Sequence, residues 1–318
     1  MKIWKLTRNV LQFLQILELM TDQEFYQVFH SERAEAPAHE FVKLNSPSTT
    51  QLKRKSSSEN RVLSFTAFGH FYDLLLKPRD GVLIGKDTPV WHVQTNPLNS
   101  SQPEYTRLPD VMNNLNGIYQ DTENMISLIE NKFETSGESY YDGMIAPDLA
   151  ISPIPRRLVQ MMSNSTNANT MEDHVIFKIS ADNVTIDYEP SDNVLADKRS
   201  NQNIYRLFPL RTFYPEILVV VDLSLYSHLG YEPDLAMNYI VPFWNGVDLR
   251  YKLLETPQVK LNIAGVILAQ DETALQFIFN NLDESGRIHA KEAILDAGEY
   301  FDTNAEFITK DVIVTMTK

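Results

Sequence analysis

His39 and Glu40 open a segment, HEFVK, that begins like the zinc-protease motif HExxH. In that motif two histidines four residues apart lie on one face of a helix and bind the metal, and the glutamate acts as general base. The fifth position here is Lys43, which cannot replace the second imidazole, so we interpret the segment as a chance match. The other histidines stand singly and predict neither a helical ligand pair nor a catalytic triad: His30, His70, His92, His174, His228 and His289.

Two further segments approach motifs that bind phosphate or a divalent cation. Gly81 to Lys86 (GVLIGK) is one residue short of a phosphate-binding loop and lies between two predicted strands, so we interpret it as a hairpin turn. Val219 to Ser227 (VVVDLSLYS) follows a strand with Asp-x-Ser, as in von Willebrand A-type adhesion modules, whose oxygen ligands at alternate positions hold a divalent ion. Tyr226 occupies the third ligand position, with a serine one residue further on, so an adhesion module is kept as an alternative.

Composition excludes several classes of function. The chain has 318 residues, enough for two domains, and its hydrophobic and charged fractions of 43% and 22% are those of a globular protein. A formal net charge of −14 argues against a nucleic-acid-binding surface, which needs clustered lysines and arginines. Without cysteine the chain can form no disulfide, thiolate metal site or cysteine nucleophile. No run reaches the roughly 20 apolar residues of a membrane-spanning helix.

The first 25 residues leave two interpretations open. A basic start is followed by an apolar stretch from Val10 to Met20, as in a signal peptide, but polar residues interrupt the stretch and no clear cleavage site follows. The segment is either a degraded signal peptide or an amphipathic helix of the mature chain. Three Asn-x-Ser/Thr sequons, at Asn99, Asn164 and Asn183, are candidate glycosylation sites and tilt the interpretation slightly toward secretion.

The first half of the chain predicts a β-rich unit. Apolar side chains alternate along residues 61–76, the turn KPRDG follows, and residues 82–93 are predicted to return as the paired strand. Further strands are predicted at 140–154 and 174–179. Residues 191–212 are mostly polar, so we interpret them as a linker with Lys198-Arg199 as one candidate cleavage point.

Beyond this linker the pattern changes to alternating strands and helices. EILVVVD (216–222), VKLNIAGVILA (259–269) and DVIVTMT (311–317) are apolar runs typical of strands buried on both faces. Helices are predicted between them, in the segments that start at Asp234, Glu272 and Lys291; Pro242 should kink the first. The last of these helices should bury a stripe formed by Ile294, Ala297 and Phe301. This alternation predicts a parallel sheet with helical crossovers.

These segments resemble, in order and spacing, the start of the catalytic domain of reprolysin/ADAM-type zinc metalloendopeptidases, in particular the secreted arthropod forms of venom and saliva. The resemblance is carried by Pro215-Glu216, VVVD, FWNGVDLRY, LNIAGV and DVIVTMT. In the first half LSFTAFGHFYDLLLKP, TPVWHV, GMIAPDLAISPIPRRL and HVIFKI are similar to the propeptide of that family. Together these segments cover nearly the whole chain from about Val62.

The resemblance implies an α+β protein. It would comprise a β-rich propeptide-like domain at 26–190, a linker at 191–212, and at 213–318 the N-terminal, parallel-sheet part of an incomplete α/β metzincin-type catalytic domain. In that family HExxHxxGxxH supplies three zinc-binding imidazoles and the catalytic glutamate. The sequence lacks this motif, so we expect no catalytic residue and no zinc ligand in the chain as written, and zinc only in the complete family enzyme. The propeptide-like part also lacks the cysteine by which many relatives occupy the zinc.

One cation site is also implied by the resemblance. Relatives often hold a structural calcium with a glutamate just before the first strand of the catalytic domain and an aspartate that opens the third. Glu216 and Asp311 occupy these positions here.

We therefore expect a secreted, truncated zinc metalloendopeptidase zymogen that has no peptidase activity of its own. Its expected partners are protein substrates or full-length metalloproteinase relatives, with no nucleic acid and no membrane span. Two alternatives remain: a non-catalytic binding or inhibitory protein whose propeptide-like half occupies the cleft of a full-length relative, and the adhesion module.

Overall fold

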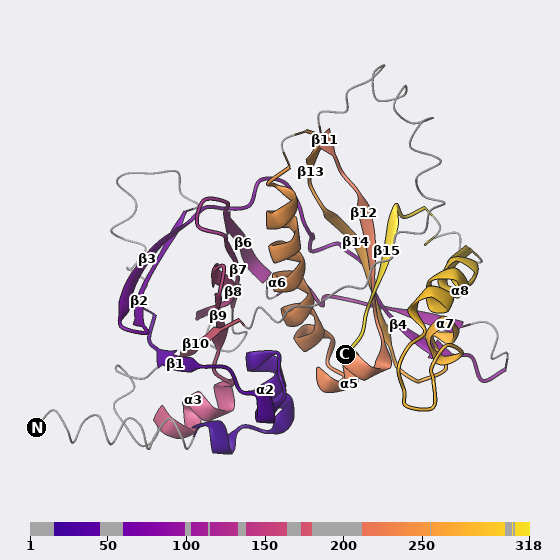
Figure 1. Cartoon of the computed structure of the whole chain (residues 1–318), viewed down its shortest axis with the longest axis horizontal. Helices are drawn as coiled ribbons and strands as arrows, with labels where there is room; N and C mark the ends of the chain where they lie inside the picture. Colours follow the sequence, from indigo (N-terminus) through magenta and orange to yellow (C-terminus); the bar gives the residue numbers. More distant parts are fainter. Residues whose placement is uncertain are drawn as a thin grey trace, which may run out of the picture.

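The computed structural model describes residues 16–44, 60–98, 103–113, 115–132, 138–163, 173–179, 212–254, 256–302, 307 and 309–318. Within these residues the chain is a mixed α+β protein, which confirms the broad fold class. Two larger sheets lie on either side of one long helix, α6 (Pro233–Tyr251), as Figure 1 shows. We call residues 16–179 the N-terminal half and residues 212–318 the C-terminal half.

The C-terminal half contains the predicted parallel sheet. Strands β12 (Glu216–Val221), β14 (Asn262–Ala269) and β15 (Val312–Met316) pair in parallel in the order β15–β12–β14. All residues of β12 from Ile217 to Val221 are buried, as expected for a β-branched strand covered on both faces. The same expectation is wrong for β15, which lies at the edge of the sheet and is only partly buried, with Val312 43% exposed. The short strands β11 (Thr212–Phe213) and β13 (Gln258–Val259) pair in the same sense.

The same sheet includes two strands of the N-terminal half. β4 (Val90–Thr95) pairs in parallel with β14, and β5 (Pro103–Leu108) pairs antiparallel with β4, which gives the order β15–β12–β14–β4–β5. The predicted return of residues 82–93 onto residues 61–76 is therefore wrong, since β2 (Arg61–Ala67) pairs with β3 (His70–Leu76) instead. GVLIGK is accordingly a connection between two sheets rather than a hairpin turn.

The side chains of β4 explain this pairing. Val90, Trp91 and Val93 are all nearly inaccessible, so both faces of the strand need apolar cover. The two-stranded β2–β3 ribbon cannot supply that cover, whereas the edge of a parallel sheet with helices on both sides can.

The second large sheet belongs wholly to the N-terminal half. It is antiparallel in the order β1–β10–β9–β8–β7–β6, and it confirms the strands predicted at 140–154 and 174–179. Its strands are β1 (His39–Val42), β6 (Leu115–Asp121), β7 (Ile126–Lys132), β8 (Ser139–Ala146), β9 (Leu149–Pro153) and β10 (His174–Lys178). The β2–β3 ribbon packs on this sheet, with Leu63 and Phe65 buried in one cluster with Leu128 and Ile151.

A small helical layer covers another part of the N-terminal half. It consists of α2 (Asp22–Phe29), the 3₁₀ helix η1 (Arg33–Glu35) and α3 (Arg156–Ser163). Thr21 begins α2 with a capping box, in which its hydroxyl accepts from the Glu24 amide while the Glu24 carboxylate accepts from the Thr21 amide. Ile16 and Met20, from the apolar stretch for which two interpretations were open, are buried against this layer, and residues 1–15 lie outside the described residues.

Helix α6 is covered on two sides, because it lies between the two large sheets (Figure 1). Ile240 and Trp244 belong to the apolar cluster under the parallel sheet, while Gly246 lies close to Ser127 of β7. The helix continues through Pro242. Phe243 of this helix is 48% exposed, so not every large apolar side chain of α6 is buried by the two sheets.

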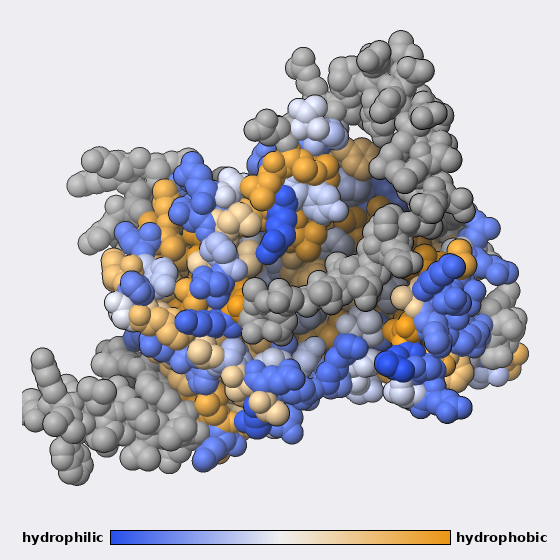
Figure 2. Space-filling model, in the orientation of Figure 1, coloured by the Kyte–Doolittle hydropathy of each residue, from blue (hydrophilic) through white to orange (hydrophobic). Residues whose placement is uncertain are grey.

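The remaining helices, α5 (Leu223–His228), α7 (Gln276–Phe279) and α8 (Ala290–Asp302), follow the strands of the parallel sheet. Phe301 of α8 is buried as predicted, but Ile294 is 72% exposed and Ala293 is buried in its place. The predicted inward stripe is therefore wrong at Ile294. Exposed apolar side chains also gather around the C-terminal end of α6 (Figure 2), where Leu253 and Leu254 lie.

Candidate functional site

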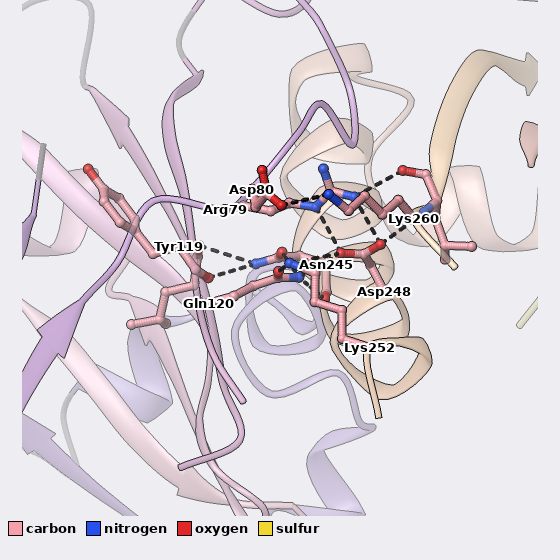
Figure 3. Close-up of polar contacts among 10 residues, drawn as sticks. Arg79, Asp80, Tyr119, Gln120, Asn245, Asp248, Lys252 and Lys260 are labelled. Carbon is pink, nitrogen blue, oxygen red and sulfur yellow. Dashed lines mark hydrogen bonds and ion pairs between the residues drawn. The ribbon is translucent and has the colours of Figure 1, made fainter. Parts of the chain in front are cut away.

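A buried ion pair joins the two halves of the chain. Arg79, which follows β3 in the segment KPRDG, donates from Nε and Nη2 to the two carboxylate oxygens of Asp248 on α6, over 2.8 and 2.9 Å (Figure 3). The exposed fractions of the two side chains are 2% and 0%. Such a two-point contact between a planar guanidinium and a carboxylate fixes both position and orientation.

The backbone of Leu261 completes this contact from the C-terminal half. Its carbonyl accepts from Arg79 Nη2 over 3.0 Å, and its amide donates to Asp248 over 3.0 Å. Lys260 beside it pairs with Asp80 over 2.6 Å at the exposed rim. One arginine of the N-terminal half is thus held by both α6 and the segment that leads into β14.

A second set of hydrogen bonds continues the contact toward β6. Nε2 of the Gln120 side chain donates to the carbonyl oxygen of the Asn245 side chain and to Asp248, over 2.9 Å each (Figure 3). The Asn245 side chain donates in turn to the carbonyls of Tyr119 and Leu128, over 3.2 and 3.3 Å. Because these are backbone groups of β6 and β7, α6 is bonded to the antiparallel sheet itself.

The charges in this cluster shift one another's protonation. Burial alone would raise the pKa of Asp248, but the hydrogen bonds from Arg79 and Gln120 and the arginine charge outweigh it, so the pKa lies below its usual value. Burial lowers the pKa of Lys252, although the Asp248 carboxylate nearby opposes this. Asp248 is therefore ionised at neutral pH and depends on Arg79 for neutralisation, because an unpaired buried carboxylate is strongly disfavoured.

Sequence reasoning did not find this cluster. The segment KPRDG has the composition of a polar turn, and no role was predicted for Asp248, which was considered only as part of the segment FWNGVDLRY. One signal was present: Asn245 and Asp248 stand three residues apart on a largely apolar helix, where two polar side chains on one face indicate a polar partner.

The two residues proposed for calcium are brought together. Asp311 accepts from the Glu216 amide over 2.9 Å, and the Asp311 amide donates to the Glu216 carbonyl over 3.0 Å. The Glu216 carboxylate faces Lys310 at 3.2 Å and is half-exposed. The pair thus joins the starts of β12 and β15 through the backbone, with a lysine beside one of the two carboxylates.

The other sequence motifs take structural positions. His39 and Glu40 lie in strand β1, so HEFVK has no helical face. Asp222 caps α5, accepting from the Leu225 amide over 2.8 Å and from the Thr317 hydroxyl over 2.5 Å, and burial raises its pKa. The three sequons at Asn99, Asn164 and Asn183 and the Lys198-Arg199 pair lie outside the described residues.

The fit of the chain to zinc can be tested on its side chains. Within the described ranges, which include all seven histidines, no group of three or more His, Asp or Glu residues could hold a metal ion. The described side chains therefore offer no set of ligands for a zinc centre. None of the helices in the described part of the chain is long and apolar enough to cross a membrane.

Comparison with known proteins finds relatives that are named as metalloproteinases. No family model matches the chain. It is 27% identical over 301 residues to "A disintegrin and metalloproteinase with thrombospondin motifs like" of Bombyx mori. The aligned region covers 80% of this chain and 43% of the relative. It is 24% identical over 290 residues to Venom metalloproteinase 3 of Eulophus pennicornis, with 89% and 64% covered, and 26% identical over 306 residues to Venom metalloproteinase 2, with 93% and 69% covered.

These relatives are named as metalloproteinases, and the similarity supports the resemblance to reprolysin/ADAM-type metalloproteinases that the sequence indicates. The chain spans between 43% and 69% of the length of these three curated relatives.

Proposed function

We propose that the chain carries the propeptide and the first part of the catalytic domain of a secreted zinc metalloendopeptidase that acts on protein substrates. In this proposal residues 26–190 are the propeptide, 191–212 the linker, and 213–318 the parallel-sheet part of a metzincin-type domain. The observation that carries it is the extent of the similarity: the venom metalloproteinases match 89% and 93% of the chain, through both halves.

The fold supports this division of roles. The N-terminal half supplies strands β4 and β5 to the sheet of the C-terminal half. Its antiparallel sheet also covers the side of α6 that faces away from the parallel sheet. A propeptide built in this way would help the catalytic part to fold, because it satisfies a sheet edge and the polar face of a buried helix.

Peptide hydrolysis is not assigned to any residue of the sequence. The motif HExxHxxGxxH is absent from it, and the described side chains do not fit zinc. We propose that these 318 residues alone do not cleave peptides. Calcium at Glu216 and Asp311 stays part of the proposal; it would require the Glu216 carboxylate to exchange Lys310 for the ion.

Three measurements test the proposal. The purified 318-residue chain should contain no stoichiometric zinc and should leave casein and gelatin intact; zinc at one equivalent together with turnover would contradict the inactive assignment. If the N-terminal half is a propeptide, the mature secreted protein should begin between residues 180 and 212. A mature protein that still carries β4 in the same polypeptide as β14 would contradict the propeptide assignment.

For calcium, the melting temperature of the chain should rise when calcium is added, and the melting temperature of Asp311→Asn should not change.

A further inference from the structure

A cavity lies where the antiparallel sheet meets α2 and the N-terminal part of α6. Its volume is about 300 Å³, which is at the lower end of the range for small-molecule sites. Residues of α2, β8, α6 and the start of α3 line it, and Figure 1 shows these elements next to one another. Apolar and aromatic side chains make up most of the wall, including Val28, Ile154, Leu229 and Leu235. The cavity therefore offers a small organic molecule a mainly apolar surface.

Asp142 of β8 brings a charge into this wall. The residue is 7% exposed, and its carboxylate accepts a hydrogen bond from the Ser152 hydroxyl over 3.0 Å and another from the Gly143 backbone. Both donors are neutral, so neither of them balances the charge of the ionised carboxylate. Burial accordingly raises the pKa of Asp142 to about 7. A carboxylate in such a position is stabilised strongly by a cation that enters the cavity beside it.

Two tyrosines stand near this carboxylate in the wall. Tyr140 lies two residues before Asp142 on β8, so both side chains leave the same face of the strand. The Tyr140 hydroxyl accepts from the Asn238 side chain over 3.4 Å, and Tyr239 of α6 lines the cavity as a half-buried side chain. Aromatic faces attract cations, and attract them more strongly where water is excluded. A buried carboxylate, aromatic rings and apolar side chains around one cavity are together suited to an organic ammonium ion.

The other charged groups of the wall compete little with Asp142. Glu24 of α2 forms an ion pair with Arg157, so its charge is already balanced. Arg156, at the start of α3, is partly exposed, and solvent screens its charge more than that of a buried group. A cation that enters the cavity is therefore attracted most strongly to Asp142.

We propose that this cavity is a binding site for a small organic ammonium ion, whose nitrogen contacts the Asp142 carboxylate while its apolar part lies against Val28, Ile154 and Leu235. A divalent metal ion fits less well, because it requires several oxygen ligands around it, and no group of three or more His, Asp or Glu residues in the described ranges could hold one. The site goes beyond the proposed function, since it requires neither peptidase activity nor a propeptide role for the N-terminal half.

The test uses the full chain and three probes of similar shape and different charge: benzylamine, benzyl alcohol and benzoate. Titration calorimetry at pH 8 should show benzylamine binding at one equivalent. Its affinity should exceed that of benzyl alcohol by at least about 10-fold, because hydrogen bonds between charged groups are stronger than neutral ones. Benzoate should not bind. No measurable binding at about 10 mM benzylamine, equal affinities of the amine and the alcohol, or tighter binding of benzoate would each overturn the proposal.

A matched pair of variants locates the charge. Asp142→Asn keeps the shape of the side chain, and it should fold because it removes a buried charge; it should weaken benzylamine binding at pH 8 by at least about 10-fold. Asp148→Asn removes an exposed carboxylate between β8 and β9 and should leave the affinity unchanged within about 2-fold. Leu235→Trp fills the cavity without changing its charge and should abolish binding. Benzylamine binding that survives both Asp142→Asn and Leu235→Trp would place the ligand elsewhere.

Benzylamine affinity should also depend on pH through Asp142. The amine stays protonated between pH 5 and pH 8, whereas Asp142 is ionised mainly above pH 7. Because the ammonium ion binds the ionised carboxylate, its affinity should fall about 100-fold from pH 8 to pH 5.

The other titratable groups of the wall do not produce this change. Burial would raise the pKa of Glu24, but its bond to Arg157 outweighs this and keeps the pKa below its usual value. Burial raises the pKa of Tyr140 and of Tyr239, so both stay neutral between pH 5 and pH 8. An affinity that is the same at pH 5 and pH 8 would contradict the contact with Asp142.

Discussion

Trp91 packs against Gly265 so closely that no side chain fits at that position of β14: a Cβ atom built on Gly265 would lie 2.6 Å from Cζ3 of the indole. The same Cβ would lie 3.2 Å from Leu218 on β12. This glycine therefore allows a large aromatic residue of the N-terminal half to pack over a central strand of the C-terminal half.

Gly265→Ala should accordingly destabilise the whole chain, by about 1–3 kcal/mol as for other overpacked cores. Urea unfolding followed by tryptophan fluorescence measures the change. Gly298→Ala is the matched control: its added Cβ meets nothing within 4 Å in α8, so the variant should be more stable by about 0.5–1 kcal/mol. A neutral Gly265→Ala would show that the indole can move away at no cost.

The buried ion pair leads to a prediction about two variants and their combination. Arg79→Met should destabilise the chain by about 3–5 kcal/mol, because it leaves the Asp248 carboxylate buried without a partner charge. Arg79→Met combined with Asp248→Leu replaces the pair by apolar groups and should recover most of that loss, although Gln120 and the Leu261 amide lose an acceptor. Unfolding free energies of the single and double variants measure the coupling, and simple additivity would contradict it.

The parallel sheet of β12, β14 and β15 could be predicted from the sequence, but the origin of β4 and β5 at its other edge could not. EILVVVD and LNIAGVILA are continuous apolar runs, and such runs mark central strands whatever their partners are. TPVWHV carries the same local signal as any short strand, while its partner β14 lies more than 170 positions further along the chain. Pairing at that separation depends on which sheet edge is left open after folding, and local periodicity carries no information about it.

The candidate site was missed for a related reason. Arg79 lies in a segment whose composition indicates an exposed turn, and only the packing of α6 between two sheets buries it. The calcium candidates Glu216 and Asp311 were paired by the family resemblance, and the structure places them in direct contact at the starts of two parallel strands. The sequence therefore indicated neighbours within one sheet better than contacts between the two halves.

Asp142 on β8 predicts a pH dependence of stability. Its side chain is buried, and burial raises its pKa to about 7, against hydrogen bonds from Ser152 and the Gly143 backbone. The unfolded chain loses this proton near pH 3.9, so between about pH 4 and pH 7 the folded state binds the extra proton and stability falls as pH rises. Above pH 7 the penalty is constant.

Asp142→Asn removes this titration. The variant should match the unmodified chain near pH 4 and exceed it above pH 7 by about 2 kcal/mol or more, at about 1.4 kcal/mol per pKa unit. Melting temperatures at pH 5 and pH 8 measure the difference, which should be larger at pH 8. Asp148→Asn changes an exposed carboxylate nearby and should show no such trend. An equal difference at both pH values would mean that Asp142 is ionised throughout.

Residues 212–318 expressed alone should not fold cooperatively. Without the N-terminal half they lose the β4 pairing of β14, the cover over α6 and the cation that neutralises Asp248. Uncovering each large apolar side chain costs about 1.5–3 kcal/mol, and a few such losses equal the whole stability of a domain, about 5–15 kcal/mol. The fragment should bind a hydrophobic dye and unfold without a sharp transition, whereas adding residues 16–179 on a second co-expressed chain should restore a single cooperative melt. A sharp, reversible transition of the isolated fragment would show that its core is complete without the N-terminal half.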